Sequence, residues 1–183
     1  MGRKERVDSR TQALTRGNRE GMTSLSPTTI RRLHVQGFTD DAWLAEVSPW
    51  LRLSPTLCGT FAALGTATAS PAILFVLAGI ALLGAILPFH PFDLIYNYGI
   101  RFLVGKRALP SNGVPRRFAC GIAAVWLVAT ALFFVGGQAI AGYALGALFV
   151  VVAGLVSTTD ICIPSLMYHL FRRLVGGASP TMR

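Results

Sequence analysis

Acidic residues are scarce in this sequence. Its 183 residues include 8 Asp and Glu against 17 Lys and Arg, and only 14% are charged whereas 52% are hydrophobic. This composition leaves too little polar surface for an ordinary soluble domain and predicts an integral membrane protein. The net charge of +9 does not indicate nucleic-acid binding, because the basic residues are segregated from the apolar runs instead of alternating with stacking aromatic residues.

Cysteine is also rare, since only Cys58, Cys120 and Cys162 are present, far apart in the sequence. This spacing excludes a disulfide framework. Cys58 and Cys120 occupy comparable places near the beginnings of two predicted membrane spans, so one hypothesis is a redox pair, with Cys162 as a third candidate. The other hypothesis is that they are small buried hydrophobic residues.

No catalytic motif is found: the sequence lacks C-x-x-C-H, phosphate-binding glycine loops and H-E-x-x-H. The predicted spans also lack ionisable residues, which argues against a pump or an ion-coupled transporter. His90 and His169 would bind haem or a metal only if they faced each other at one depth. We therefore predict no metal site and no cofactor, and leave open a bound lipid, quinone or pigment.

Four apolar stretches predict transmembrane helices at about residues 55–69, 71–88, 118–135 and 139–156. The second contains PAILFVLAGIALLGAIL, which has no charge and no polar face. The first is built of Thr, Ala and Gly, and Gly142 and Gly146 give the fourth a GxxxG face. Because small residues allow helices to approach closely, we expect these faces to contact protein, including other membrane subunits.

The remaining segments are polar or amphipathic. Residues 1–53 predict a basic cytoplasmic extension with two short helices, the first capped by Ser26 and Pro27 and the second at about residues 40–53. Further amphipathic helices at the membrane interface are expected at about residues 92–104 and 163–174. The transmembrane domain then covers residues 54–175, and residues 176–183 form a C-terminal tail.

An offset of 72 residues aligns polar and aromatic positions of the two halves. It pairs Asp93 with Ser165, Tyr96 with Tyr168, Asn97 with His169, and Arg101 with Arg173. The predicted fold is therefore an all-α membrane protein with four transmembrane helices, arranged as two parallel-repeat hairpins that are each followed by an amphipathic interfacial helix.

All Lys and Arg residues lie in the N-terminal region, the central loop with its flanks, or the C-terminal segment. The two hairpin tips have none. The positive-inside rule places both termini and the central loop in the cytoplasm, and we expect a multi-pass protein of the bacterial inner membrane.

Several stretches are similar to a known family: PFHPFDLIYNYGIRFLVG, the segment Pro-Arg-Arg-Phe-Ala before the third span, and Asp160-Ile-Cys162 leading to Tyr168. From about Trp50 to Phe171 the chain resembles an uncharacterised bacterial integral-membrane family, domain of unknown function 4395. The resemblance implies no particular activity. The family pattern has a second Cys after the one that corresponds to Cys162, where this chain has Ser165.

We expect a non-catalytic accessory or assembly subunit of a bacterial inner-membrane complex, of respiratory or photosynthetic type. The alternatives are a thiol- or quinone-linked redox protein and a small-solute transporter. Membrane lipids and other membrane subunits are the expected partners of the extension and the amphipathic helices. The candidate interaction residues are Arg3, Lys4, Arg6, Arg31, Arg32, Trp43, Trp50, Asp93, Tyr96, Arg101, Tyr168, Arg172 and Arg173.

Overall fold

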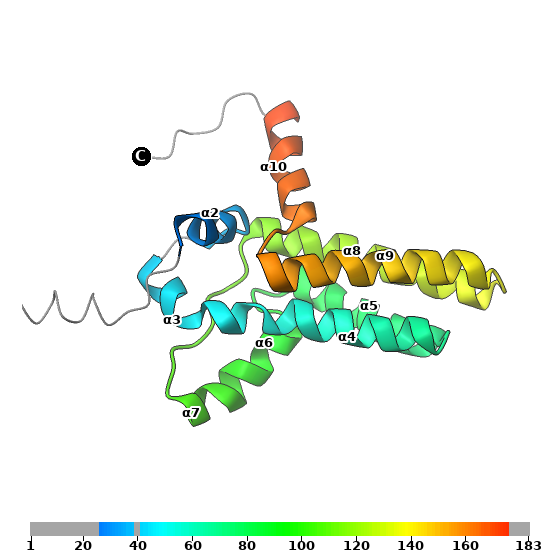
Figure 1. The fold of residues 1–183 in the computed structure, drawn as a ribbon, viewed down its shortest axis with the longest axis horizontal. Helices are drawn as coiled ribbons and strands as arrows, with labels where there is room; N and C mark the ends of the chain where they lie inside the picture. The colour runs from blue at the N-terminus through cyan, green and yellow to red at the C-terminus, as the bar shows by residue number, and fades with distance from the viewer. Residues whose placement is uncertain (1–25, 39–40, 176–183) are drawn as a thin grey trace, which may run out of the picture.

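The computed structural model describes residues 26–38 and 41–175. Within these ranges the regular structure is entirely helical, as predicted. Four long helices lie side by side, and the shorter helices gather at one end of them (Figure 1). The long helices are α4 (Leu53–Ala67), α5 (Pro71–Ile86), α8 (Val114–Val135) and α9 (Ala139–Thr159).

The long helices form two hairpins. Residues 68–70 connect α4 to α5, and residues 136–138, with Gly137 at a φ of 72°, connect α8 to α9. The hairpins pack crosswise, because α5 makes its most extensive contacts with α8 and α4 makes its most extensive contacts with α9. The two halves of the chain therefore have equivalent neighbours, as a structural repeat requires. The shared core consists mainly of Leu and Ala, including Leu74, Leu77, Ala81, Leu127 and Ala131.

The small residues of α9 are used inside the chain. A Cβ atom added to Gly146 would lie 2.9 Å from Thr66 Cβ of α4, and one added to Gly142 would lie 2.8 Å from Phe134 Cε1 of α8. Both contacts are closer than a side chain tolerates, so Gly146 allows the two hairpins to approach each other and Gly142 allows close packing of α8 on α9 within the second hairpin.

Helix length limits which elements can cross a bilayer alone. Among the described residues α8 and α9 are long and apolar enough, and a third span results if α5 is joined to Pro91–Val104 across a bend of 82°. The helices α4 and α5 have 15 and 16 residues, which is about 22–24 Å of rise and less than a hydrocarbon core of about 30 Å. The predicted all-helical fold is confirmed, and two or three helices of the described ranges are long and apolar enough to cross a membrane, whereas four spans stay a prediction.

The shorter helices are largely where the sequence predicted them. Ser26 caps the first through a bond from Thr28 N–H, and Pro27 begins it. The segment expected as one helix at residues 92–104 instead contains a π-helical turn. In chain order the elements are α2 (Pro27–Val35), α3 (Asp41–Leu51), α6 (Pro91–Ile95), the π-helical η1 (Tyr96–Ile100), α7 (Arg101–Val104) and α10 (Ile163–Val175).

A second core forms where α2 and α3 meet the central loop. Leu33, Val47 and Leu109 are almost completely buried in it, and the Trp50 and Tyr96 rings pack with their centroids 4.9 Å apart. The described part of the N-terminal extension therefore covers the polar end of its own bundle.

Candidate functional site

A cavity of about 140 Å³ lies between the two hairpins near the end that carries the short helices. Its walls come from all four long helices and are mostly apolar, with Ala81, Ala123 and Phe149 among them. All three cysteines of the chain line it, together with His90. Cys58 belongs to α4, Cys120 to α8 and Cys162 to the turn before α10, so three distant segments bring their thiols to one space.

Cys58 has His90 as its polar neighbour, with 3.9 Å between Cys58 Sγ and His90 Nε2. The His90 side chain also caps α6, because its Nδ1 accepts a hydrogen bond of 3.3 Å from Phe92 N–H. An accepting Nδ1 leaves the proton of the neutral ring on Nε2, so this N–H faces the sulfur. Burial lowers the pKa of His90 to about 4, and the positive Arg116 adds to this effect while Asp93 opposes it.

Arg116 forms a buried ion pair at the start of α8. Its Nη2 lies 3.7 Å from Asp93 Oδ1 and donates a bond of 3.4 Å to Leu51 O. Ser54 Oγ donates to the same Asp93 oxygen. Arg116 and Asp93 expose only 9% and 2% of their side chains, so each depends on the other for compensation of its charge.

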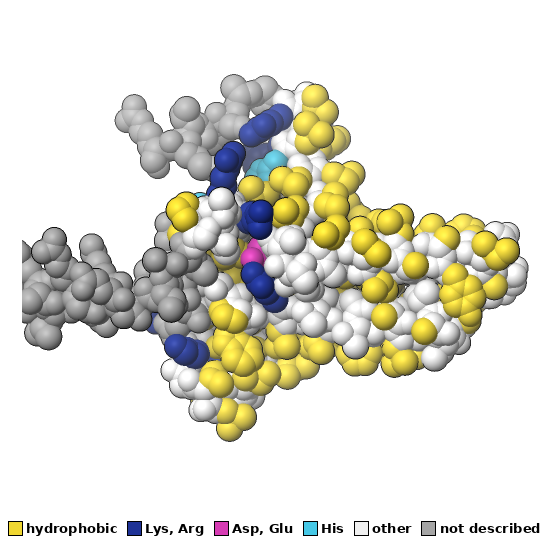
Figure 2. Space-filling model, in the orientation of Figure 1, with side chains coloured by type: hydrophobic (Ala, Val, Ile, Leu, Met, Phe, Trp, Pro, Cys, Tyr) yellow, Lys and Arg dark blue, Asp and Glu magenta, His cyan; other side chains and the backbone are white. Residues whose placement is uncertain are grey.

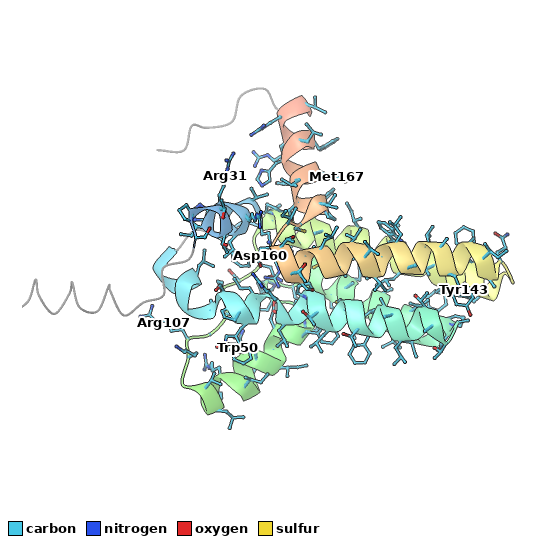
Figure 3. The ribbon with its side chains drawn as sticks, viewed as in Figure 1. Arg31, Trp50, Arg107, Tyr143, Asp160 and Met167 are labelled. Carbon is cyan, nitrogen blue, oxygen red and sulfur yellow. The ribbon has the colours of Figure 1, made fainter. Side chains whose placement is uncertain are left out.

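Arg52 forms the second ion pair, just before α4. Its Nε and Nη2 donate to Asp160 Oδ1 and Oδ2 at 3.0 and 2.6 Å. The hydrogen bond to Asp160 raises the pKa of the Arg52 guanidinium further above its usual value. Asp160 ends α9 in the left-handed conformation with a φ of 57°, and its carbonyl oxygen accepts a bond of 2.8 Å from Gln36 Nε2. Figure 3 shows Asp160 at the junction of α2, α4, α9 and α10.

The two ion pairs have equivalent positions in the two halves. Each arginine lies at the beginning of a hairpin's first helix, and each aspartate follows the second helix of the other hairpin. Both arginines and Asp160 also line the cavity. The pairs therefore join the hairpins crosswise at the end of the bundle where the thiols lie.

Several predicted interaction residues lie on the outside of this end. Arg31, Arg172 and Arg173 are exposed, and Arg32 Nη1 donates a bond of 2.7 Å to Thr159 O. On the face shown in Figure 2, charged side chains gather near α2 and α10, while the hairpins beyond them present hydrophobic and uncharged groups.

Other predicted residues contact the chain itself. Tyr168 packs on Phe118 with ring centroids 5.5 Å apart, and the Arg101 guanidinium lies 4.6 Å from the Phe102 ring centroid. Asp93 and Tyr96, which were predicted as interaction residues, are 1% and 0% exposed. Asp93 instead contacts Arg116 and Ser54, and Tyr96 packs on Trp50, so both side chains join elements of the chain to one another.

Some predictions fall outside the described residues: Arg3, Lys4, Arg6 and the side chain of Trp43. The two histidines do not form a shared site, because His90 faces Cys58 whereas His169 Nε2 lies 2.9 Å from Val35 O. Within the described ranges no group of three or more His, Cys, Asp or Glu side chains is suited to hold a metal ion.

Arg52, Arg116 and His90 line the cavity with the cysteines, and this grouping was not predicted from the sequence. An available signal was a proline near the start of each hairpin with an arginine close to it, Arg52 three residues before Pro55 and Arg116 directly after Pro115. An arginine near the start of both hairpins indicates a similar structural role for the two cations.

Comparison with known proteins supports the sequence resemblance. No curated protein and no solved structure matches the chain. Residues 48–173 match the family model described as Domain of unknown function (DUF4395), which is more than half of the chain. The chain therefore belongs to this DUF4395 family.

Proposed function

We propose that the protein is a thiol-linked redox protein of a membrane. The observation that carries this proposal is the convergence of Cys58, Cys120 and Cys162 on one apolar cavity. Two thiols that react together release two electrons and two protons as their S–H bonds break and one S–S bond forms. A cavity between helices keeps this chemistry away from water and within reach of lipid-soluble reactants.

The membrane arrangement is part of the proposal. All four long helices span the bacterial inner membrane, with both termini and the central loop in the cytoplasm. The segregation of Lys and Arg supports this orientation. Local thinning of the bilayer and snorkelling side chains accommodate the shorter helices α4 and α5. The cysteine-lined cavity then lies near the cytoplasmic side.

Trapping of thiols in native membranes tests the redox proposal. Membranes from reduced and oxidised cells are quenched in acid, and free thiols are alkylated with a mass tag and counted by mass spectrometry. We expect two of the three thiols to become protected together after oxidation. Of the single Ser variants at positions 58, 120 and 162, two should lose this change and one should retain it, which makes that variant the matched control. If all three thiols are alkylated equally in both states, the proposal fails.

An accessory role in a membrane complex is the second proposal. Its support is the apolar surface of α7 and α10 that the described part of the chain leaves uncovered: Phe102 and Leu103 are 67% and 87% exposed, and Leu170 and Leu174 are 58% and 77% exposed. Such faces bind lipid at the membrane surface or a neighbouring subunit.

Purification from the native host in mild detergent tests the accessory role. We expect a defined partner to co-migrate with the tagged protein. A variant that lacks residues 1–25 keeps α2 and α3 and shows whether the basic segment contributes. Elution of the full-length protein alone would exclude this role.

A further inference from the structure

A second hollow lies against the cysteine-lined cavity. It is an open groove of about 910 Å³ between α5 and α8, with Leu82, Ala85, Gly121 and Val125 in its walls. Ile122 and Trp126 line both the groove and the inner cavity. The two spaces are therefore neighbours, separated by the same two side chains.

The inner cavity has the size of one six-membered ring. An engineered apolar cavity of about 150 Å³ in another protein binds benzene, and the cavity described here has about 140 Å³. The polar groups in its lining include hydrogen-bond donors beside the sulfur atoms, namely His90 Nε2–H and the thiols themselves. The Asp160 carboxylate also lines it but is paired with Arg52. A ring that carries carbonyl oxygens matches both the volume and these donors.

The groove has the properties expected of a site for a hydrocarbon chain. It lies on the outer side of α5 and α8, where Val125 is 73% and Leu82 is 51% exposed. Gly121 leaves space at its base, because a Cβ atom there would meet only Ala85 Cβ at 3.8 Å. Since both helices belong to the proposed spans, a chain in this groove remains in contact with lipid.

We infer that this protein binds a membrane quinone, with the quinone ring in the inner cavity and the isoprenoid tail in the groove between α5 and α8. This inference rests on the proposed redox function and names its co-reactant. Two thiols lose two electrons and two protons and form a disulfide. The quinone takes up these two electrons and two protons, one proton on each carbonyl oxygen, and becomes a quinol. The bend between ring and tail lies at Ile122 and Trp126.

Tryptophan fluorescence of the full-length protein in nanodiscs tests the inference. The probes are a benzoquinone with a short isoprenoid tail and the same ring without a tail. We expect saturable quenching by both, with binding of the tailless ring about tenfold weaker because its contacts in the groove are lost. Quenching should decrease in Trp126→Phe, since Trp126 lines both spaces.

Three substitutions locate the ligand. Ala123→Phe fills the inner cavity and should abolish binding of both probes. If this variant does not fold, Ala119→Leu adds a smaller side chain to the same cavity and should also abolish binding. Gly121→Leu narrows the groove and should weaken only the tailed probe. Gly154→Leu is the matched control, because a Cβ atom there meets nothing within 4 Å and Gly154 lines neither space.

The outcomes separate this inference from the redox proposal. Unchanged quinone binding in folded Ala123→Phe and Ala119→Leu, or the absence of saturable binding to the unmodified protein, would refute the inference. Paired oxidation of the thiols in native membranes would still support the redox function in that case. Conversely, quinone binding without any change in the thiols would leave the binding site in place and refute the redox proposal.

Discussion

Arg52 and Asp160 are 108 residues apart in the sequence and form a two-pronged ion pair at 3.0 and 2.6 Å. Arg116 and Asp93 form the equivalent pair at 3.7 Å, with the arginine in the second hairpin and the aspartate after the first. Each pair joins the beginning of one hairpin to the segment that follows the other. The two ion pairs therefore stabilise the crosswise packing that brings the three cysteines to one cavity.

The two ion pairs should differ in their contribution to stability. Arg116→Met leaves the carboxylate of Asp93 buried without its cation, which we expect to reduce the free energy of unfolding by about 3–5 kcal/mol. Arg52 exposes 42% of its side chain, so Arg52→Met should reduce it by about 1 kcal/mol or less. Thermal unfolding of both variants in one detergent measures the difference. Equal losses of unfolding free energy in the two variants would contradict the burial of Arg116 and the exposure of Arg52.

Substitution of the α9 glycines should depend strongly on position. A methyl group at Gly146 meets Thr66, so Gly146→Ala should destabilise the protein by about 1–3 kcal/mol. Gly154 is on the same helix and has no neighbour within 4 Å of an added Cβ atom. Gly154→Ala should therefore be neutral or stabilise by up to about 1 kcal/mol through its higher helix propensity. Similar unfolding temperatures for the two variants would show that the hairpins do not approach closely at Gly146.

His90 should make stability depend on pH. Its pKa falls from 6.5 in the unfolded chain to about 4 in the folded protein, so the unfolded state binds more protons between these values. The contribution is fully present above pH 6.5 and is lost as the pH falls towards 4, by about 3 kcal/mol in total. His90→Asn retains a side chain that can cap α6 but does not titrate. Unfolding measured between pH 7 and pH 4 should show a smaller decrease for this variant, and identical profiles would exclude His90 as the cause.

Cysteine labelling should confirm the proposed orientation. In a cysteine-free background, Ser111→Cys in the central loop should react with a membrane-impermeant reagent only after the cells are opened. Gln138→Cys at the tip of the second hairpin should react in intact cells. Both positions are exposed, so access to the thiol does not limit the reaction. Labelling of Ser111→Cys from outside would reverse the orientation.

The sequence predicted the elements of this fold better than their contacts. Helix boundaries follow from local signals such as Ser26 before Pro27 and the glycines at residues 136–137. In the structure one helix begins at Pro27, and another ends directly before the two glycines. The burial of Asp93 was not predicted, because it depends on Arg116 and Ser54 from two other segments. Tyr96, the first residue of the π-helical turn, packs against Trp50 of α3, and a period of 3.6 residues indicates neither the turn nor this contact.

The candidate site could not be predicted from the sequence, because it depends on the crosswise packing of the two hairpins. Similar locations of Cys58 and Cys120 in the two halves suggested a pair, but their shared cavity results from contacts between α4 and α9 and between α5 and α8. Cys162 and His90 reach the cavity from turns that follow the hairpins, and no spacing rule connects them to the other two residues. Tertiary contacts of this kind carry no signature in a single sequence.

Retention of a monosubstituted arsenical by the purified protein tests the central claim most directly. Such a compound binds two neighbouring thiols firmly and a single thiol only weakly. If the thiols share one cavity, the reduced protein should retain the arsenical after a wash with excess monothiol, and the variant Cys58→Ser with Cys120→Ser, in which only Cys162 remains, should lose it. Complete release of the arsenical from the unmodified, folded protein would show that the three cysteines do not converge and would contradict the account.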